Sequence, residues 1–187
     1  MRLFVAVRPP AAAVAELEDA VRPLRAQADG LTWTTAGQWH LTLVFLAEVP
    51  SERVPELERR LGRAAERHPS PRLYVGGAGR FGDRLLLAKI GGDVEELRRL
   101  AASVQAAARR TGLQVEERPY RPHLTLARAR GGTDVRPLVA QLKDFRGAPW
   151  IAREIELVRS RLGQGPDRRA AHDTLRSWPL TSRAPSP

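Results

Sequence analysis

The sequence predicts an α+β fold in two duplicated lobes, with two antiparallel sheets that face each other and helices on the outside. The tetrapeptide His40-Leu41-Thr42-Leu43 returns unchanged as His123-Leu124-Thr125-Leu126, and strand-like and helix-like segments follow in a similar order around each copy. A length of 187 residues suits one domain, and no linker rich in Gly, Pro or Ser divides the halves. We therefore assign residues 1–180 to a single bilobal domain and expect 181–187 to be a disordered tail.

Local patterns predict the elements of the first half. In order, they are a strand at 2–7, a helix from Pro10 to about Ala28, a short strand at 31–35, the first motif strand at 39–46 and an amphipathic helix at 51–67. Apolar residues recur at helical spacing in both helices, and Pro23 should end or kink the first one early. The strand at 31–35 is expected to pair with the motif strand, because a short turn segment at Ala36-Gly37 separates them.

Local patterns also predict the elements of the second half. Its elements are strands at 72–79 and 84–90, a helix from Asp93 as N-cap to Gly112 as its stop, the second motif strand at 122–128, a weaker helix at 135–142, a long bent strand at 150–162, a loop at 163–167 and a closing strand at 174–180. Gly76 and Gly77 predict a bulge or a close backbone approach within the first of these strands.

Composition limits the functional class. The formal net charge of +10 favours a polyanionic partner. The charge is nearly all arginine, which binds phosphate through a planar fork, although a compositional bias of the source genome would produce the same excess. No apolar run approaches the roughly 20 residues that cross a bilayer, and the absence of cysteine removes disulfides, thiolate nucleophiles and sulfur-ligated zinc. We expect a cytoplasmic protein that is a monomer and does not bind membranes.

The repeated tetrapeptide carries the chemistry. Because side chains alternate across a strand, His and Thr at positions i and i+2 share one face, and the two leucines share the other. Two such strands side by side would place two imidazoles and two hydroxyls around one small anion. That set suits proton transfer at phosphorus, since imidazole gives and accepts protons near neutral pH.

These motifs carry a family resemblance over nearly the whole chain. The chain resembles the two-histidine phosphoesterase superfamily, defined by two H-x-T-[LIV] motifs, and more narrowly the bacterial and archaeal RNA 2′,3′-cyclic phosphodiesterases, historically named 2′-5′ RNA ligases. The similar segments are RLFVAVRPP, Trp33, HLTLVFLAEV, RPYRPHLTLAR, and IELVRSRLGQG through LRSWPL. Two positions depart from the family pattern. Ala47 stands where glycine is common, which we expect to be harmless, and His172 aligns where tyrosine is common.

The resemblance implies a bilobal fold with pseudo-twofold symmetry and an active site in the cleft between the lobes. It implies hydrolysis of an RNA 2′,3′-cyclic phosphate end to a 2′-phosphomonoester, with no metal and no cofactor. By analogy with the family, His40 is the proton donor and His123 the proton acceptor. Thr42 and Thr125 should hydrogen-bond the non-bridging phosphate oxygens.

Three further residues are expected to bind substrate. Arg128 occupies a typical family position, but alternation from His123 puts it on the opposite strand face unless the strand ends or bulges. Tyr120 lies three residues before His123 and offers a ring on which a base could stack. His172 could line the cleft in place of the family tyrosine.

Other functions remain open from the residues alone. A module that binds RNA or nucleotides without turnover would also explain the positive charge. Ligation of RNA to a 2′-5′ linkage, and hydrolysis of a small cyclic nucleotide, would use the same groups. A histidine metal site is disfavoured, because the motif strands contain no acidic residue and the histidines have no ligand spacing.

Overall fold

The computed structural model describes residues 1–165 and 170–182 of the chain. Positions 166–167 of the expected loop and 183–187 of the expected tail lie outside these residues. The described strands form two antiparallel sheets. In spatial order the first contains β3 (Leu41–Glu48), β1 (Arg2–Val7), β8 (Glu154–Arg161) and β9 (Ala171–Pro179). The second contains β2 (Leu31–Trp33), β6 (His123–Ala129), β5 (Leu85–Gly92), β4 (Arg72–Phe81) and β7 (Trp150–Ile151).

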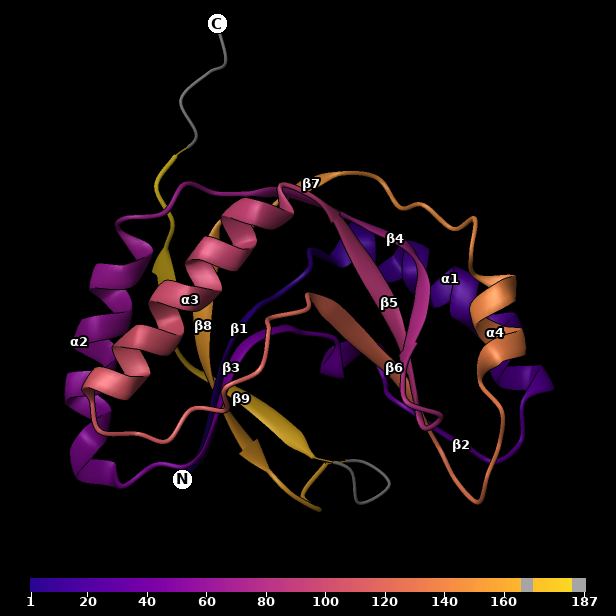
Figure 1. Ribbon diagram of the computed structural model, residues 1–187, viewed down its shortest axis with the longest axis horizontal. Helices are drawn as coiled ribbons and strands as arrows, with labels where there is room; N and C mark the ends of the chain where they lie inside the picture. Colours follow the sequence, from indigo (N-terminus) through magenta and orange to yellow (C-terminus); the bar gives the residue numbers. More distant parts are fainter. Residues whose placement is uncertain (166–169, 183–187) are drawn as a thin grey trace, which may run out of the picture.

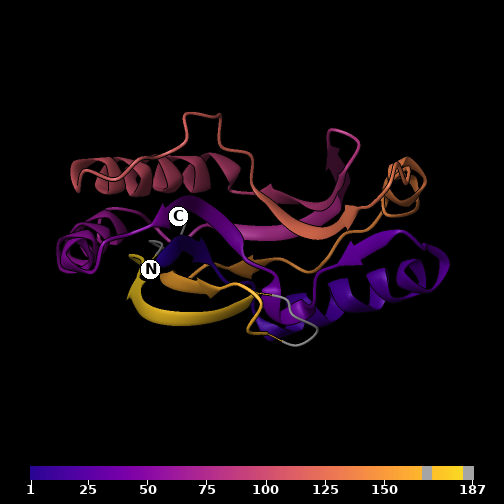
Figure 2. The same cartoon turned by 90° about the horizontal axis from the view of Figure 1, so that it is seen from below.

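Two pairs of helices lie outside the sheets, which confirms the predicted fold class. The helices are α1 (Ala11–Gln27), α2 (Val54–Ala65), α3 (Val94–Arg110) and α4 (Arg136–Gln141). Helices α2 and α3 pack together against the first sheet, whereas α1 and α4 contact β4 of the second. Figure 1 shows the strands between these helix pairs, and Figure 2 shows the pairs at opposite ends of the molecule.

Helix α1 continues past its proline to Gln27, close to the expected bound at about Ala28, so Pro23 does not end the helix early. Proline removes one backbone hydrogen bond from a helix interior. The apolar face of α1 continues on both sides of that position, with Val21 at 0% and Leu24 at 3% exposure. Burial of this face holds the last turn in place, because a buried aliphatic side chain contributes about 1.5–3 kcal/mol.

The expected pairing of β2 with the first motif strand is wrong. Strand β2 pairs with β6, and β3 pairs with β1 in the other sheet. The short 3-10 helix η1 (Ala36–Gln38) carries the chain from one sheet to the other. Thr34 fixes this crossing, because its backbone N–H donates to the Leu126 carbonyl and its hydroxyl accepts from the Trp39 indole N–H.

The long bent strand expected at 150–162 is two strands in different sheets. Strand β7 pairs with β4, and β8 pairs with β1 and β9. The two residues between them make the crossing: the Ala152 N–H donates to the Pro71 carbonyl, and the Arg153 carbonyl accepts from the Leu180 N–H. Periodicity alone does not detect such a change of sheet, because both pieces are extended.

A shared core fixes the two motif strands. The four motif leucines, Leu41, Leu43, Leu124 and Leu126, are at most 1% exposed and belong to one cluster of buried residues that draws on both sheets.

A second short 3-10 helix, η2 (Ser51–Arg53), precedes α2. In the described part of the chain, no helix combines the length and apolar character needed to cross a membrane.

Candidate active site

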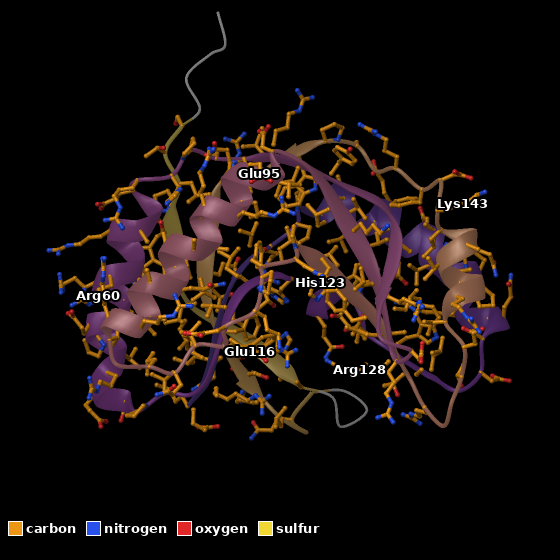
Figure 3. All side chains as sticks on the ribbon, in the orientation of Figure 1. Arg60, Glu95, Glu116, His123, Arg128 and Lys143 are labelled. Atoms are coloured by element: carbon orange, nitrogen blue, oxygen red, sulfur yellow. The ribbon has the colours of Figure 1, made fainter. Side chains whose placement is uncertain are left out.

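The two copies of the motif come from different sheets and line one cleft. His40 directly precedes β3, His123 begins β6, and these two strands contact each other. Both histidines and both motif threonines, Thr42 and Thr125, line a cleft of about 640 Å³. Figure 3 shows His123 near the middle of the molecule, between the two helix pairs.

Each motif histidine is held by the same backbone contact. The Nδ1 of His40 lies 3.1 Å from the Gln38 carbonyl, and the Nδ1 of His123 lies 2.7 Å from the Arg121 carbonyl. A carbonyl oxygen only accepts, so each Nδ1 carries the hydrogen. A neutral imidazole then presents an unprotonated Nε2, and the His40 Nε2 has no hydrogen-bond partner among the described residues. The two rings are thus equivalent proton acceptors until one is charged.

Burial favours the neutral form of both histidines in the free protein. It lowers the pKa of His40 to about 4, against the opposing hydrogen bond to Gln38, and the nearby Arg8 cation adds to the lowering. Burial also lowers the pKa of His123, again opposed by its backbone hydrogen bond. Desolvation penalises the charged imidazolium form in both cases. A bound anion would favour the charged form and raise these pKa values.

A β-bulge places Arg128 on the face of the catalytic candidates. On β5, Leu85, Leu87 and Lys89 share one face by alternation, and they pair with Arg128, Thr125 and His123 respectively. Strand β6 therefore contains one extra residue, and the register shifts between Leu86 and Leu87 of its partner. Simple alternation would have turned Arg128 away, whereas the bulge directs it into the cleft.

The first motif strand has the same irregularity. The register of β3 shifts between Val44 and Thr42, so Phe45 returns to the face of His40 and lines the cleft with 63% exposure. Phe45 thus occupies in the first copy the place that Arg128 occupies in the second, five residues after the histidine. We did not predict Phe45; the equal spacing in the two copies was the available signal.

Phe81 is a second aromatic residue of the cleft. Its ring meets the His123 ring edge-on with centroids 4.8 Å apart. This edge-on contact and the backbone hydrogen bond to Arg121 together restrict the orientation of the imidazole.

The two remaining predicted substrate-binding residues, His172 and Tyr120, differ in their position relative to the cleft. His172 is not among the cleft-lining residues; its ring packs against His40 with centroids 5.3 Å apart and against Phe4 at 5.2 Å. Tyr120 lines the cleft and also packs against the core. Burial raises the pKa of the Tyr120 hydroxyl, which has no partner among the described residues. The ring of Tyr120, rather than its hydroxyl, is therefore the feature offered to a ligand.

An ion pair between the exposed Arg8 and the buried Glu156 lies beside His40, and sequence reasoning missed it. Arg8 donates to both carboxylate oxygens of Glu156 at 3.0–3.3 Å, and the Thr174 hydroxyl donates to the same group at 2.9 Å. Burial alone would raise the pKa of Glu156, but these hydrogen bonds outweigh it and lower the pKa. An acidic residue inside the apolar run of β8 was the available signal, because a buried charge requires a partner.

No metal centre is evident in this region. Within residues 1–165 and 170–182, no group of three or more His, Cys, Asp and Glu side chains is arranged to hold a metal ion. The groups that the cleft offers are imidazoles, hydroxyls, a guanidinium and aromatic rings. This set can bind an anion and move protons.

Comparison with known proteins adds an independent finding. The model of the 2′-5′ RNA ligase superfamily matches residues 5–164. The RNA 2′,3′-cyclic phosphodiesterase of Thermus thermophilus is 33% identical over 176 residues, covering 87% of this chain and 83% of that protein. The Geobacillus stearothermophilus protein of the same name is 27% identical over 153 residues, and this chain spans about half its length. The structure of E. coli LigT complexed with 3′-AMP matches with a TM-score of 0.76 at 27% identity, covering 97% of this chain and 98% of that one.

Proposed function

Since the chain belongs to the 2′-5′ RNA ligase superfamily, we propose that it hydrolyses the 2′,3′-cyclic phosphate at the end of an RNA strand to a 2′-phosphomonoester. One observation carries the proposal. Two histidines with equivalent backbone hydrogen bonds, contributed by different sheets, line one cleft together with the two motif threonines. The relatives named above support this choice of substrate.

The two histidines divide the proton transfers. His123 Nε2 accepts a proton from water as the water oxygen attacks phosphorus, and the bond from phosphorus to the 3′ oxygen breaks. His40 in its imidazolium form delivers a proton to that leaving oxygen. The product has a 2′-phosphate and a 3′-hydroxyl, and a proton moved from His123 to His40 restores the pair. Paired acid and base catalysis of this kind contributes about 10²–10⁴-fold for each group.

Binding of the phosphate favours the protonated form of His40, which is the form that acts as general acid. In the free protein His40 is neutral at pH 7, because burial lowers its pKa to about 4. An anionic substrate beside the ring raises the pKa of His40, so that its Nε2 takes up from solvent the proton that the leaving oxygen requires. Thr42 and Thr125 donate to the non-bridging oxygens, and Arg128 faces the same anion from the second sheet. Fixed donors of this kind stabilise the charge that develops in the transition state.

His172 acts through His40 in this scheme. Its ring packs against His40 beside the pair formed by Arg8 and Glu156. We assign His172 and Arg8 as positioning residues that set the orientation and the pKa of His40. Tyr120 is assigned to the base or sugar of the terminal nucleotide, because its ring forms part of the cleft wall.

The proposal extends to the form in which the protein works. We propose that residues 1–180 make one bilobal domain and that the protein acts as a cytoplasmic monomer, without metal or cofactor. One cooperative unfolding transition would support the single domain, and a monomeric mass in solution would support the monomer. Two separate transitions, or a stable dimer, would contradict them.

The decisive experiment identifies the product. A short RNA ending in a 2′,3′-cyclic phosphate is incubated with the protein in EDTA, and the position of the product phosphate is determined by chromatography. We expect a 2′-phosphate, and rates lower by roughly two to four orders of magnitude in His40→Ala and His123→Ala. His68→Ala is the matched control, since His68 contacts Ser103 and does not line the cleft. Binding without turnover, or full activity in either motif variant, would contradict the proposal.

A further inference from the structure

A second hollow adjoins the candidate active site at the end of the second sheet. It has a volume of about 680 Å³ and lies between the β4–β5 turn, the end of β6 and the loop that follows β6. Three arginines, Arg84, Arg130 and Arg136, and two aspartates, Asp83 and Asp134, are among the residues that line it. We call it the arginine pocket.

The arginine pocket continues from the catalytic cleft along two chain segments. In the β4–β5 turn, Gly82 lines the cleft and Asp83 lines the pocket; on β6, Arg128 lines the cleft and Ala129 lines the pocket. Arg80 of the cleft forms an ion pair with Asp83 of the pocket at 2.8 Å. Figure 3 places Arg128, at the junction, on the β4–β5 side of His123. Neighbouring residues of the same two segments therefore line the cleft and the pocket.

The pocket retains positive charge after its own ion pairs are formed. Asp83 is paired with Arg80, and Asp134 is paired with Arg136 at 2.9 Å. Arg84 is exposed and has no side-chain hydrogen bond or ion pair within the described residues. Arg130 uses its Nε to donate to the Thr32 hydroxyl, which leaves the terminal nitrogens of its guanidinium free to bind an anion. Within residues 1–165 and 170–182, two cations of the pocket are thus not neutralised by carboxylates.

The backbone at the pocket permits a close approach. Gly131 and Gly132 both have positive φ, at 56° and 84°, and both line the pocket. A Cβ atom added at either position would meet no atom within 4 Å. A phosphate group therefore finds open space beside these glycines and two free guanidinium groups at the same place.

We propose that the arginine pocket binds the phosphodiester backbone of the RNA strand that precedes the cyclic end. This inference rests on the proposed function and names its substrate class as an oligonucleotide rather than a mononucleotide. From His123 to Arg130 the chain advances about 23 Å at 3.3 Å per residue. Since stacked nucleotides rise about 3.4 Å each, a mononucleotide held at the histidines does not reach the pocket, and a strand of several nucleotides does.

The test compares two substrates in matched variants. The substrates are a 2′,3′-cyclic mononucleotide and a ten-nucleotide RNA with the same terminal group, assayed with the intact protein at low salt. We expect Arg84→Gln to lower kcat/KM for the RNA by about three- to tenfold and to leave the mononucleotide unchanged. Arg63→Gln is the control, because Arg63 is also exposed but lies on α2, away from both hollows.

A binding measurement keeps the two proposals distinguishable. The affinity for the same RNA, already opened to its 2′-phosphate, is measured over a range of salt concentrations. Loss of one phosphate contact should reduce the salt slope by about 0.7 in Arg84→Gln, as expected for single strands. An unchanged salt slope and RNA affinity in Arg84→Gln, or an equal loss of kcat/KM for both substrates, would overturn the proposal that the arginine pocket binds RNA. If the wild type turned over neither substrate, the proposed function would fail. The binding measurement would still test whether the arginine pocket binds RNA.

Discussion

The buried position of His40 predicts a specific loss of stability in acid. In the unfolded chain a histidine has a pKa of about 6.5, whereas burial lowers the pKa of His40 to about 4 in the folded protein. The unfolded state therefore binds the proton more tightly below pH 6.5, and stability falls as the pH drops from 6.5 towards 4. At pH 5 the difference of roughly 1.5 pH units from 6.5 corresponds to about 2 kcal/mol of unfolding free energy.

Urea unfolding at pH 7 and pH 5 measures this effect. We expect the wild type to lose about 2 kcal/mol from His40, with further loss from His123 and His172, whose pKa values are also lowered by burial. His40→Gln should remove the His40 part of the pH dependence. His68→Gln is the comparison: burial also lowers the pKa of His68, but its side chain is less buried, so this variant should keep the His40 part of the pH dependence. An NMR titration of His40 with a midpoint near 6.5 would refute the reasoning.

The same pKa shifts set the expected pH profile. Because kcat/KM reports the free enzyme, its bell-shaped profile should have both limbs below about pH 6.5, and it should not respond to EDTA. The profile of kcat should lie at higher pH, since the bound anion raises the pKa of both histidines. A kcat/KM optimum above pH 7 would contradict this account.

Four substitutions test individual features. Arg128→Gln should lower kcat/KM for a cyclic mononucleotide about tenfold or more with an unchanged circular dichroism spectrum; full activity would place the guanidinium away from the phosphate. Thr125→Val should reduce kcat by about 10²–10³ through loss of a fixed donor, and an effect on KM alone would instead indicate a binding role. His172→Phe should keep the packing on Phe4 but raise the pKa of His40, moving the limb of the kcat/KM profile that His40 controls to higher pH; a uniform drop in rate without that shift would indicate a structural role only. Ala47→Gly should raise the free energy of unfolding in urea by about 0.5–1 kcal/mol, because Ala47 has a φ of 51° and a left-handed conformation costs an L residue about 1–2 kcal/mol; a less stable variant would show that this backbone is not strained.

Sequence periodicity predicted the local elements well, because each depends on neighbouring residues. The strand at 2–7, the bulge at Gly76 and Gly77, and the helix that begins after Asp93 all agree with the structure. The errors concern which sheet a strand joins. Strand β2 leaves its sequence neighbour because Thr34 is bound to the Leu126 carbonyl, a contact between residues far apart in the chain. Such pairing energies leave no local pattern.

In the candidate site, too, local patterns were predicted from the sequence and contacts between distant residues were not. The repeat identified both histidines and both threonines, and the structure brings these four side chains to one cleft. Alternation gave the wrong face for Arg128 because it cannot anticipate an extra residue in β6. The ion pair of Arg8 with Glu156 was missed for a similar reason, since its partners lie at opposite ends of the chain.

The pairing of β1 with β8 has a consequence for synthesis on the ribosome. Strand β1 gains β3 on one edge early, but its other edge pairs with residues such as Val158 and Arg159 near the end of the chain. At 5–20 residues per second, the interval between the two pairings is roughly ten seconds. Throughout that interval the nascent chain exposes an apolar strand edge, which is a template for association with other chains. The risk of aggregation is therefore concentrated on β1 until β8 has left the ribosome.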